Sequence, residues 1–313
     1  MSTPANPNPK TFLITGTSSG FGKQLATVAL NRGDNVVATA RKLDDIRHFA
    51  DEFPETAQVS VLDVTNPDTI ASTVDAALSR FGQIDVLVNN AGYALFGAVE
   101  EMGADGFRKQ FETNVFGLVA VTKAVLPHMR KAQAGHIIQL SSVGGQISPP
   151  GVGAYTASKH AVEGLSTALR AEVAAFGIRV TLVEPGIFLT KFDSATTRDG
   201  EHIAAYDELL EGVQRDTFGA YDLAANPTAG DPYRAAEAMY AIAGQEDAPF
   251  RLPLGRDAVE WLRQAYRERT DELELYAALA EATASNSSVD IGSVANDVSR
   301  ERVLETEMEE ALL

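Results

Sequence analysis

Between residues 11 and 186, short apolar segments alternate with amphipathic ones, and this alternation constrains the fold more than any other feature of the chain. Apolar runs of this length, bounded by turn residues, are typical of buried strands. Six strands are expected, at residues 11–16, 35–40, 59–64, 84–92, 135–142 and 178–186. Nearly continuous apolar strands separated by helices predict a parallel sheet with helices on both faces. With right-handed crossovers, the fold class is a Rossmann-like, doubly wound α/β sheet.

The segments between these strands carry helical spacing, which predicts helices at residues 20–32, 67–81, about 103–131 and 153–176. Residues 188–230 are mixed in composition, include no strand that the pattern supports, and are expected to form a substrate lid. Further on we expect a helix at 232–245, an edge strand at 249–255, a helix at 257–281, a polar linker at 285–293 and an amphipathic helix at 296–313. The expected organisation is a flexible leader (1–10), one catalytic domain (11–256) and a helical extension (257–313).

The composition excludes several classes of function. The 313 residues include no cysteine, and the five histidines lack metal-ligand spacing, so we expect no disulfide and no metal site. A formal net charge of -17 repels nucleic acid and anionic membranes at long range. No apolar run reaches the ~20 residues that span a bilayer. By default, these absences favour a cytoplasmic protein with a small-molecule partner.

A glycine-rich segment directly follows the first expected strand and opens the first helix. It reads Gly16-Thr17-Ser18-Ser19-Gly20-Phe21-Gly22, with the spacing GxxxGxG. Glycines let the backbone turn sharply and approach a pyrophosphate, and the helix N-terminus offers free N–H groups and the positive end of its dipole. An ordinary Gly/Ser turn is the alternative, but the position after the first strand favours nucleotide binding.

Tyr155 and Lys159 lie four residues apart in one expected helix, so they share a face. A neighbouring ammonium group favours the phenolate and lowers a tyrosine pKa from its ordinary value of about 10. Tyr155 is therefore a candidate general acid/base, although an exposed helical pair is the alternative. Ser142, at the end of the fifth strand, could hold a substrate carbonyl, whereas strand-end capping is favoured for Ser141.

Asparagines at two places are further candidate site residues. Asn89-Asn90-Ala91-Gly92 follows the fourth strand, and Asn114 falls inside an expected helix. Asparagine is a modest helix former, so a buried Asn114 needs a reason, whereas a solvent-facing one does not.

In their order and spacing, TGTSSGFG, NNAG, Asn114, Ser142 and Tyr155-x-x-x-Lys159 resemble the short-chain dehydrogenase/reductase family, in particular its shorter, single-domain branch. The resemblance covers about residues 10–255. It implies an oxidoreductase that interconverts a ketone or aldehyde with an alcohol by hydride transfer from a nicotinamide cofactor. It also implies a homodimer or homotetramer formed through the helices at about 103–131 and 153–176.

The resemblance also implies a role for each matched residue. Tyr155 gives or takes the proton of the carbonyl oxygen, and Ser142 hydrogen-bonds to that oxygen. Lys159 lowers the Tyr155 pKa and binds the nicotinamide ribose, while Asn114 anchors a water of the proton relay. The implied cofactor-binding residues are Gly16, Ser18, Ser19, Gly20, Phe21 and Gly22 for the pyrophosphate, Asp63 and Val64 for the adenine, Asn90, Ala91 and Gly92 for its ribose, and Pro185, Gly186, Ile187 and Thr190 for the nicotinamide amide.

The end of the second strand indicates which nicotinamide cofactor binds. Ala40 stands where NAD enzymes usually carry an acid, and Arg41 and Lys42 follow. A guanidinium pairs well with a 2′-phosphate, so NADP(H) is expected rather than NAD(H). A solvated Arg41 is the alternative, and Ser19 occupies the position before Gly20 where a further basic residue would support NADP.

The remaining candidates concern the substrate and the competing functions. The apolar segment 93–97, together with Phe188 and Phe192, is expected to line a pocket for a lipophilic or aromatic substrate, unless these phenylalanines are packing residues. His160 is expected to be structural or exposed, and the pairs Asp44-Asp45 and Glu100-Glu101 to be solvated. A non-catalytic cofactor-binding regulator would be expected to lose Tyr155, Lys159 or Ser142, and all three are present. The GxxxGxG spacing also speaks against a sugar-nucleotide epimerase or dehydratase.

Overall fold

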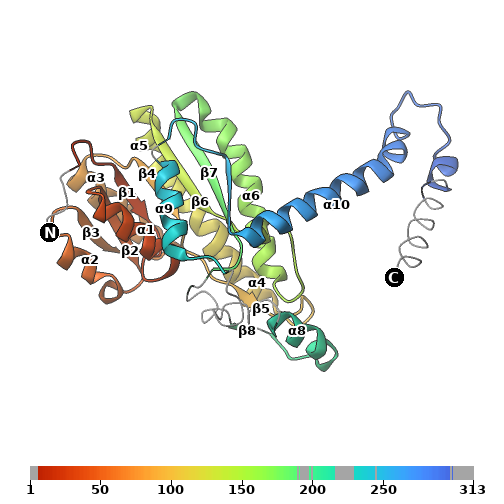
Figure 1. Cartoon of the computed structure of the whole chain (residues 1–313), viewed down its shortest axis with the longest axis horizontal. Helices are drawn as coiled ribbons and strands as arrows, with labels where there is room; N and C mark the ends of the chain where they lie inside the picture. Colours follow the sequence, from red (N-terminus) through yellow and green to blue (C-terminus); the bar gives the residue numbers. More distant parts are fainter. Residues whose placement is uncertain are drawn as a thin grey trace. The chain divides into compact units, whose positions relative to one another are not determined.

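The computed structural model describes residues 6–188, 190, 197–198, 200–215, 229–243, 245–296 and 298. The chain divides into two compact units, Met1–Val259 and Glu260–Leu313. The first unit contains the sheet and every candidate site residue (Figure 1). None of the described helices is both long and apolar enough to cross a membrane.

The first unit is built on a seven-stranded sheet in which every pairing is parallel. From edge to edge, the strands are β3 (Ala57–Val61), β2 (Asn35–Ala40), β1 (Thr11–Ile14), β4 (Val86–Asn89), β6 (Gly135–Leu140), β7 (Ile178–Pro185) and β9 (Arg251–Leu254). The order reverses between β1 and β4, and ligands of such sheets bind at the carboxyl edge beside this reversal. The doubly wound α/β fold and the edge position of the last strand are thus confirmed.

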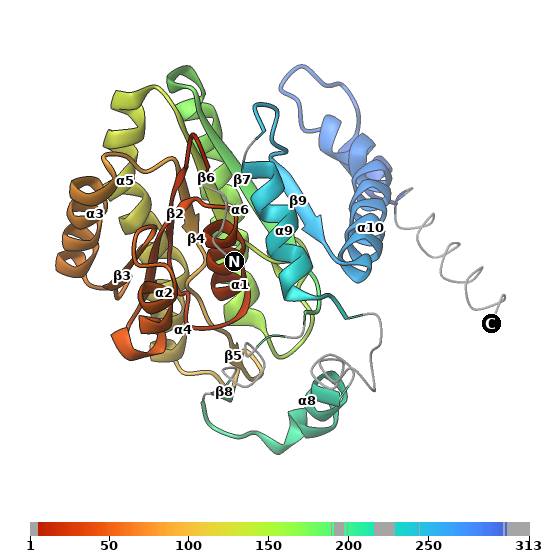
Figure 2. The same ribbon diagram turned by 60° about the vertical axis from the view of Figure 1, so that its left-hand side comes forward.

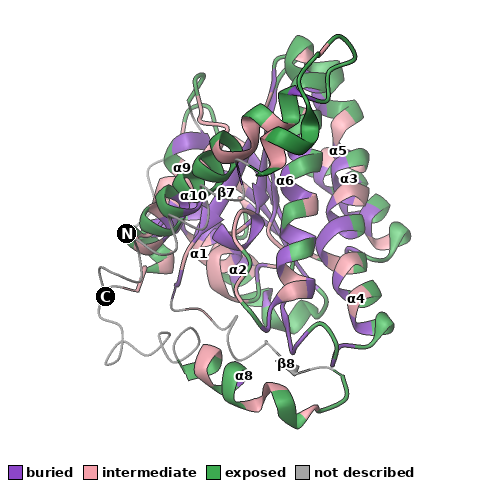
Figure 3. Cartoon of the chain, turned by 90° about the vertical axis from the view of Figure 1, so that its right-hand side faces the viewer, coloured by how far each residue is buried: buried purple, intermediate pink, exposed green. Residues whose placement is uncertain are grey.

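Helices cover both faces of the sheet (Figure 2). One face carries α1 (Gly20–Asn31), α2 (Arg47–Glu52) and α9 (Pro232–Ala243), and the other carries α3 (Pro67–Phe81), α5 (Leu118–Ala132) and α6 (Gly153–Val173). The strands between them are buried while the outer helix faces are exposed (Figure 3). This arrangement explains why the strands are apolar nearly throughout: both of their faces are covered.

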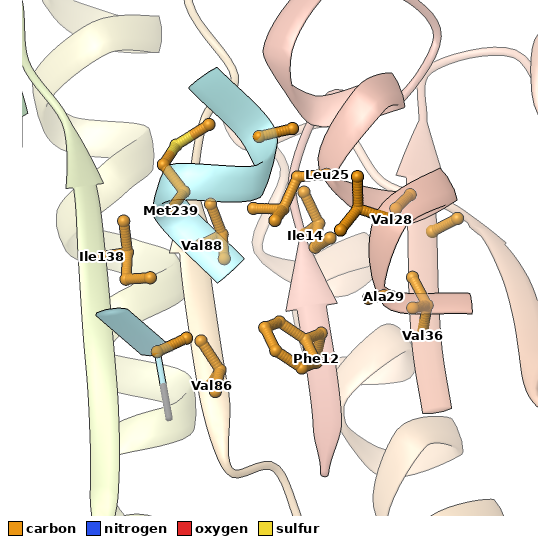
Figure 4. Close-up of a cluster of buried hydrophobic side chains, with 14 of the residues drawn as sticks. Phe12, Ile14, Leu25, Val28, Ala29, Val36, Val86, Val88, Ile138 and Met239 are labelled. Atoms are coloured by element: carbon orange, nitrogen blue, oxygen red, sulfur yellow. The ribbon is translucent and has the colours of Figure 1, made fainter. Parts of the chain in front are cut away.

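Successive residues of β1 supply the two halves of the core. Phe12 and Ile14 pack under α1 and α9, beside Val88 and Met239 (Figure 4), whereas Leu13 faces the side of α3 and α5. These three side chains of β1 are fully buried. Because neighbouring residues of a strand point to opposite faces, both layers of helices are fixed to the same strand.

The structure differs from the expected elements in several places. The single helix expected at about 103–131 is instead α4 (Ala104–Phe111), a π-helical turn (Glu112–Gly117) and α5. Sequence periodicity did not predict α2, the two-residue strands β5 (Leu95–Phe96) and β8 (Thr197–Arg198), or α8 (Asp207–Val213). Such elements are too short to carry a periodic pattern.

The chain ends also depart from expectation where the structure describes them. Asn6 Nδ2 donates to Asp34 Oδ1 at 2.7 Å and the Lys10 amide donates to the same oxygen at 2.9 Å, so this part of the leader is tied to the domain. In the second unit, α10 (Arg256–Glu281), which begins in the first unit, matches the expected helix. Residues 291–296 are helical and shorten the expected linker. The helix expected at 296–313 lies outside the described residues, apart from 296 and 298.

Candidate active site

The glycine-rich loop between β1 and α1 has a backbone conformation and close contacts that require glycine. Gly16 and Gly20 have φ angles of +71° and +58°, in the left-handed region that favours glycine. A Cβ on Gly22 would lie 2.4 Å from Asn90 Nδ2 and 2.5 Å from the Gly16 oxygen. The first helical residue after Ser19 is Gly20, so the free N–H groups of α1 open toward this loop. The cradle fits a pyrophosphate.

The segment after β4 braces that loop. Asn90 Nδ2 donates to the backbone oxygens of Thr15 and Gly16, both at 2.9 Å. The backbone N–H groups of Asn90 and Ala91 donate to Thr15 Oγ1, also at 2.9 Å. Asn90 is therefore placed to hold the shape of the glycine loop. Thr15, the first residue of the motif TGTSSGFG, belongs to this site although no role was predicted for it. A hydroxyl at the strand end, directly before the first glycine, was the available signal.

A basic group and an acidic group meet at the carboxyl ends of β2 and β3. Arg41 is exposed and follows the buried Ala40. Asp63 Oδ1 accepts hydrogen bonds from the Thr65 amide (2.9 Å) and hydroxyl (2.7 Å), which lower the pKa of Asp63, and the charge of Arg41 lowers it further. The structure thus brings Arg41 and Asp63 to one end of the loop region. Val64, by contrast, is buried against Gly117.

The segment after β7 approaches the same loop from the other side. A Cβ built on Gly20 would lie 3.7 Å from the Thr190 Cβ. The Ile187 amide donates to Asp257 Oδ2 at 2.6 Å, and a Cβ on Gly186 would overlap that carboxylate at 2.4 Å. Asp257, in the first turn of α10, therefore fixes the backbone after Pro185. Asp257 was not predicted as a site residue, because the start of this helix was expected to belong to the C-terminal extension.

Ser142, Tyr155 and Lys159 come together beside the carboxyl end of β6. Ser142 caps the short 3-10 turn Val143–Gly145, with its Oγ accepting from the Gly144 amide at 3.0 Å, and it hydrogen-bonds to Tyr155. Lys159 lies on the same face of α6 as Tyr155, with its Nζ 5.7 Å from the centre of the tyrosine ring. The Lys159 Nζ donates to the Leu140 oxygen at 2.5 Å. The spacing that predicted a shared face is confirmed.

The electrostatics of this group differ from the expectation that Lys159 lowers the pKa of Tyr155. Burial raises the pKa of Tyr155 to about 12, and the hydrogen bond with Ser142 only partly opposes it. Burial also lowers the pKa of Lys159 to about 8, against the charge of Glu163, which raises it. The low polarity of the site disfavours both charged forms, so at neutral pH Tyr155 is a phenol and Lys159 is mainly an ammonium.

Asn114 is buried at 2% exposure within the π-helical turn. Its Oδ1 accepts from the Tyr93 amide at 3.2 Å, and its Nδ2 donates to the Tyr93 oxygen (3.0 Å) and to Ser158 Oγ (3.1 Å). It therefore links the segment after β4 to α6, beside Tyr155. A wide turn of this kind inside an α-helix commonly marks a functional site, and it gives the buried asparagine the reason it needs.

An apolar cluster adjoins Tyr155. Phe96, Ala98, Val152 and Leu210 are its buried members, and Tyr155, Tyr206 and Val213 pack against it. Phe96 belongs to segment 93–97, which was expected to line a pocket. Phe188 instead packs edge-on against Phe21, with 5.0 Å between ring centres, so its interpretation as a pocket residue is replaced by core packing. Phe192 lies outside the described residues.

Glu101 corrects the expectation of a solvated acid pair. It is 4% exposed, and its two carboxylate oxygens accept from the Ala98 amide (3.0 Å) and the Ile203 amide (2.9 Å). Glu100 is exposed as expected and accepts from the Tyr206 hydroxyl at 2.6 Å. Glu101 therefore ties the chain before α8 to the segment that carries the apolar cluster. Asp44 and Asp45 are exposed, as predicted.

Two minor expectations have opposite outcomes. His160 is exposed, and its Nδ1 contacts the Thr156 oxygen at 2.9 Å, as expected of a structural residue. Ser141 does not cap its strand, because its buried Oγ has no hydrogen-bond partner among the described residues. Within the same residues, no group of three His, Cys, Asp or Glu side chains could hold a metal.

Comparison with known proteins places this geometry in a family. The model of the short chain dehydrogenase family matches residues 10–201. Oxidoreductase BOA17 of Botryotinia fuckeliana is 39% identical over 261 residues, which cover 82% of this chain and 92% of that protein. The 3-ketodihydrosphingosine reductase of Bacteroides thetaiotaomicron is 36% identical over 253 residues, or 79% of this chain and 88% of that protein.

A solved structure agrees with these relatives. The structure of ElxO with NADP bound superposes with a TM-score of 0.67 and 28% identity, covering 81% of this chain and all of that one. The parallel sheet with helices on both faces, the glycine loop and the Ser142–Tyr155–Lys159 group are the features that the family resemblance predicted. The chain belongs to the short-chain dehydrogenase/reductase family and is an oxidoreductase.

Proposed function

We propose that the protein interconverts a lipophilic or aromatic ketone or aldehyde with its alcohol, using NADP(H). The observation that carries the proposal is the grouping of Ser142, Tyr155 and Lys159 on one side of a glycine loop shaped for a pyrophosphate. The bound nicotinamide supplies or accepts the hydride. Side chains of the protein bind the carbonyl substrate and supply the proton to its oxygen.

The proton step follows from the chemistry of the three side chains. Burial, which raises the pKa of Tyr155 to about 12, keeps its hydroxyl protonated at neutral pH and ready to donate to a carbonyl oxygen. Ser142 hydrogen-bonds to Tyr155 and is placed to hold the same oxygen. The ammonium of Lys159 stabilises the negative charge that Tyr155 develops as it donates. In alcohol oxidation the same groups act in reverse.

The positive charge of Arg41 at the end of β2 favours NADP(H). Arg41 is exposed at the end of β2 and close enough to lower the pKa of Asp63, so a guanidinium stands beside the adenine end of the site. Such a group suits a 2′-phosphate. ElxO, a structural relative, was solved with NADP bound, which supports the same cofactor here.

The substrate class is argued from the apolar cluster. Phe96, Val152 and Leu210 form a buried, uncharged surface that reaches Tyr155. A surface of this kind favours apolar groups next to the reacting carbonyl. One relative is named as a 3-ketodihydrosphingosine reductase, and reduction of a keto compound by that relative supports a ketone substrate here.

The test is a fluorescence titration with NADPH and NADH, followed by a panel of ketones and aldehydes monitored at the nicotinamide absorbance. We expect NADPH to bind more tightly than NADH, and bulky apolar carbonyls to be reduced faster than small polar ones. Tight NADPH binding without turnover of any carbonyl would favour the alternative of a non-catalytic regulator. Tighter binding of NADH would contradict the reading of Arg41.

A further inference from the structure

One turn beyond Lys159, a second buried charge lies on the same face of α6. Tyr155, Lys159 and Glu163 are spaced four residues apart, which aligns the three side chains along the helix. Lys159 is 7% exposed and Glu163 is 5% exposed. A buried charge is retained only when opposite charges or hydrogen bonds compensate for its loss of water. Glu163 and Lys159 therefore share one buried, charged environment.

Two side chains from other elements fix Glu163. Its Oε2 accepts from Gln146 Nε2 at 3.1 Å and lies 3.1 Å from the NH2 nitrogen of Arg251 on β9. Both donors reach the same oxygen, and Glu163 Oε1 has no hydrogen-bond partner among the described residues. The carboxylate is therefore held firmly through one of its oxygens.

A second carboxyl shares these donors. Glu184 of β7 is 1% exposed, and its Oε1 accepts from Gln146 at 3.3 Å and lies 3.4 Å from Arg251 Nε. Burial and the charge of Glu163 raise the pKa of Glu184 to about 7, against the charge of Arg251, which lowers it. One guanidinium thus faces two buried carboxyls.

We propose that Glu163 is a positioning residue for the reaction, because its fixed carboxylate keeps the buried Lys159 protonated. The charged groups that face it come from α6 (Lys159), β7 (Glu184) and β9 (Arg251), and Gln146 adds a neutral donor. Burial alone lowers the Lys159 pKa, and Glu163 is the group that raises it. The proposal rests on the proposed function, since the charge on Lys159 matters only if Tyr155 transfers the proton.

Glu163→Gln tests this assignment, and Glu184→Gln is the matched control. Both variants remove a buried carboxyl that shares Gln146 and Arg251, but only Glu163 acts on Lys159. The first readout is an NMR titration of 13Cε-labelled lysine in the cofactor-free enzyme, with the Lys159 signal assigned from Lys159→Arg. We expect Glu163→Gln to lower the Lys159 pKa by about one unit and Glu184→Gln to leave it within ~0.3 unit of wild type.

The second readout is the pH profile of carbonyl reduction. Reduction needs the ammonium form, so its rate falls as pH rises through the Lys159 pKa of about 8, and Glu163→Gln moves this fall to lower pH. An unmoved Lys159 titration in Glu163→Gln, or an equal shift in Glu184→Gln, overturns the assignment to Glu163. A moved titration with an unmoved pH profile upholds Glu163 and instead contradicts the role of Lys159 in the proposed function. If Glu163→Gln does not fold, Glu163→Met removes the same charge, and Gln146 and Arg251 keep their contacts with Glu184.

Discussion

The two sides of the candidate active site are built in different ways. The nucleotide side, residues 15–22 and 90–92, lies at the ends of two buried strands. Asn90 closes it by donating hydrogen bonds to the backbone oxygens of Thr15 and Gly16. The substrate side, formed by Phe96, Ala98, Val152 and Leu210, stands on a two-residue strand and a seven-residue helix. Its support is the carboxylate of Glu101, which reaches Ile203. The first side is set by local backbone geometry, and the second by contacts between distant segments.

This difference implies that cofactor binding and substrate selection can be changed separately. Loops on a rigid sheet can be altered with little effect on the sheet itself. A change on the nucleotide side should affect every substrate equally, whereas a change on the substrate side should leave cofactor affinity intact. Single substitutions test that separation, and the first is at Tyr155, because both sides serve its proton transfer.

The largest effect is expected from Tyr155→Phe, which removes the proton donor and keeps the ring. Turnover should fall by about a thousandfold, in the range usual for general acid catalysis, while NADPH affinity changes by less than about threefold. Steady-state kinetics and fluorescence titration measure the two. Tyr240→Phe, which removes a hydroxyl bonded to Asp34 Oδ2 at 2.7 Å, is the control and should keep its turnover. Wild-type turnover in Tyr155→Phe would refute the role of the hydroxyl.

Gly22→Ala breaks the nucleotide side. The added Cβ would lie 2.4 Å from Asn90 Nδ2, so the brace and the loop must shift. Overpacking of this kind costs about 1–3 kcal/mol of stability, and we expect NADPH affinity to fall by about ten- to a hundredfold. Gly103→Ala is the matched control, because its Cβ meets nothing within 4 Å. Unchanged NADPH binding in Gly22→Ala would show that the loop is not the nucleotide cradle.

Glu101→Gln weakens the hydrogen bonds that support the substrate side. A glutamine has one acceptor oxygen for two backbone N–H groups, so the contact with Ala98 or with Ile203 is lost. We expect KM for a bulky carbonyl to rise by about tenfold, equivalent to one hydrogen bond to a charged group, with NADPH affinity unchanged. Glu100→Gln, at an exposed carboxylate, serves as the control. Equal loss of cofactor affinity and substrate affinity would contradict the separation of the two sides.

Arg41→Asp tests the cofactor preference of the nucleotide side, and the smallest effect is expected from it. Replacing an exposed cation beside the adenine end should lower NADPH affinity and raise NADH affinity, for a change in preference of about tenfold or ~1.4 kcal/mol. Arg47→Asp is the control, because Arg47 is an exposed cation that pairs with Asp44 instead. A preference for NADPH that survives Arg41→Asp would assign the selection to another residue.

The same difference explains what the sequence could predict. The apolar runs that form β1, β4, β6 and β7 could be predicted because these strands are buried on both faces, and the helices between them because one face of each is buried. The spacing of Tyr155 and Lys159 fixed their shared face. No local pattern indicates that Glu101 reaches a residue 102 positions away, that Asp257 holds the Ile187 amide, or that the chain widens into a π-helical turn at Asn114. The raised pKa of Tyr155 could not be predicted from the sequence either, because it depends mainly on burial of the side chain in the folded protein.

The central claim is that hydride passes between a nicotinamide and a carbonyl held beside Tyr155. The most direct measurement uses NADPH deuterated at C4, in each of its two stereochemical forms, with an apolar ketone and mass analysis of the alcohol. The account predicts deuterium on the carbinol carbon from one form and not from the other. Tight binding of NADPH, with no deuterium transferred from either form to any carbonyl of the panel, would contradict it.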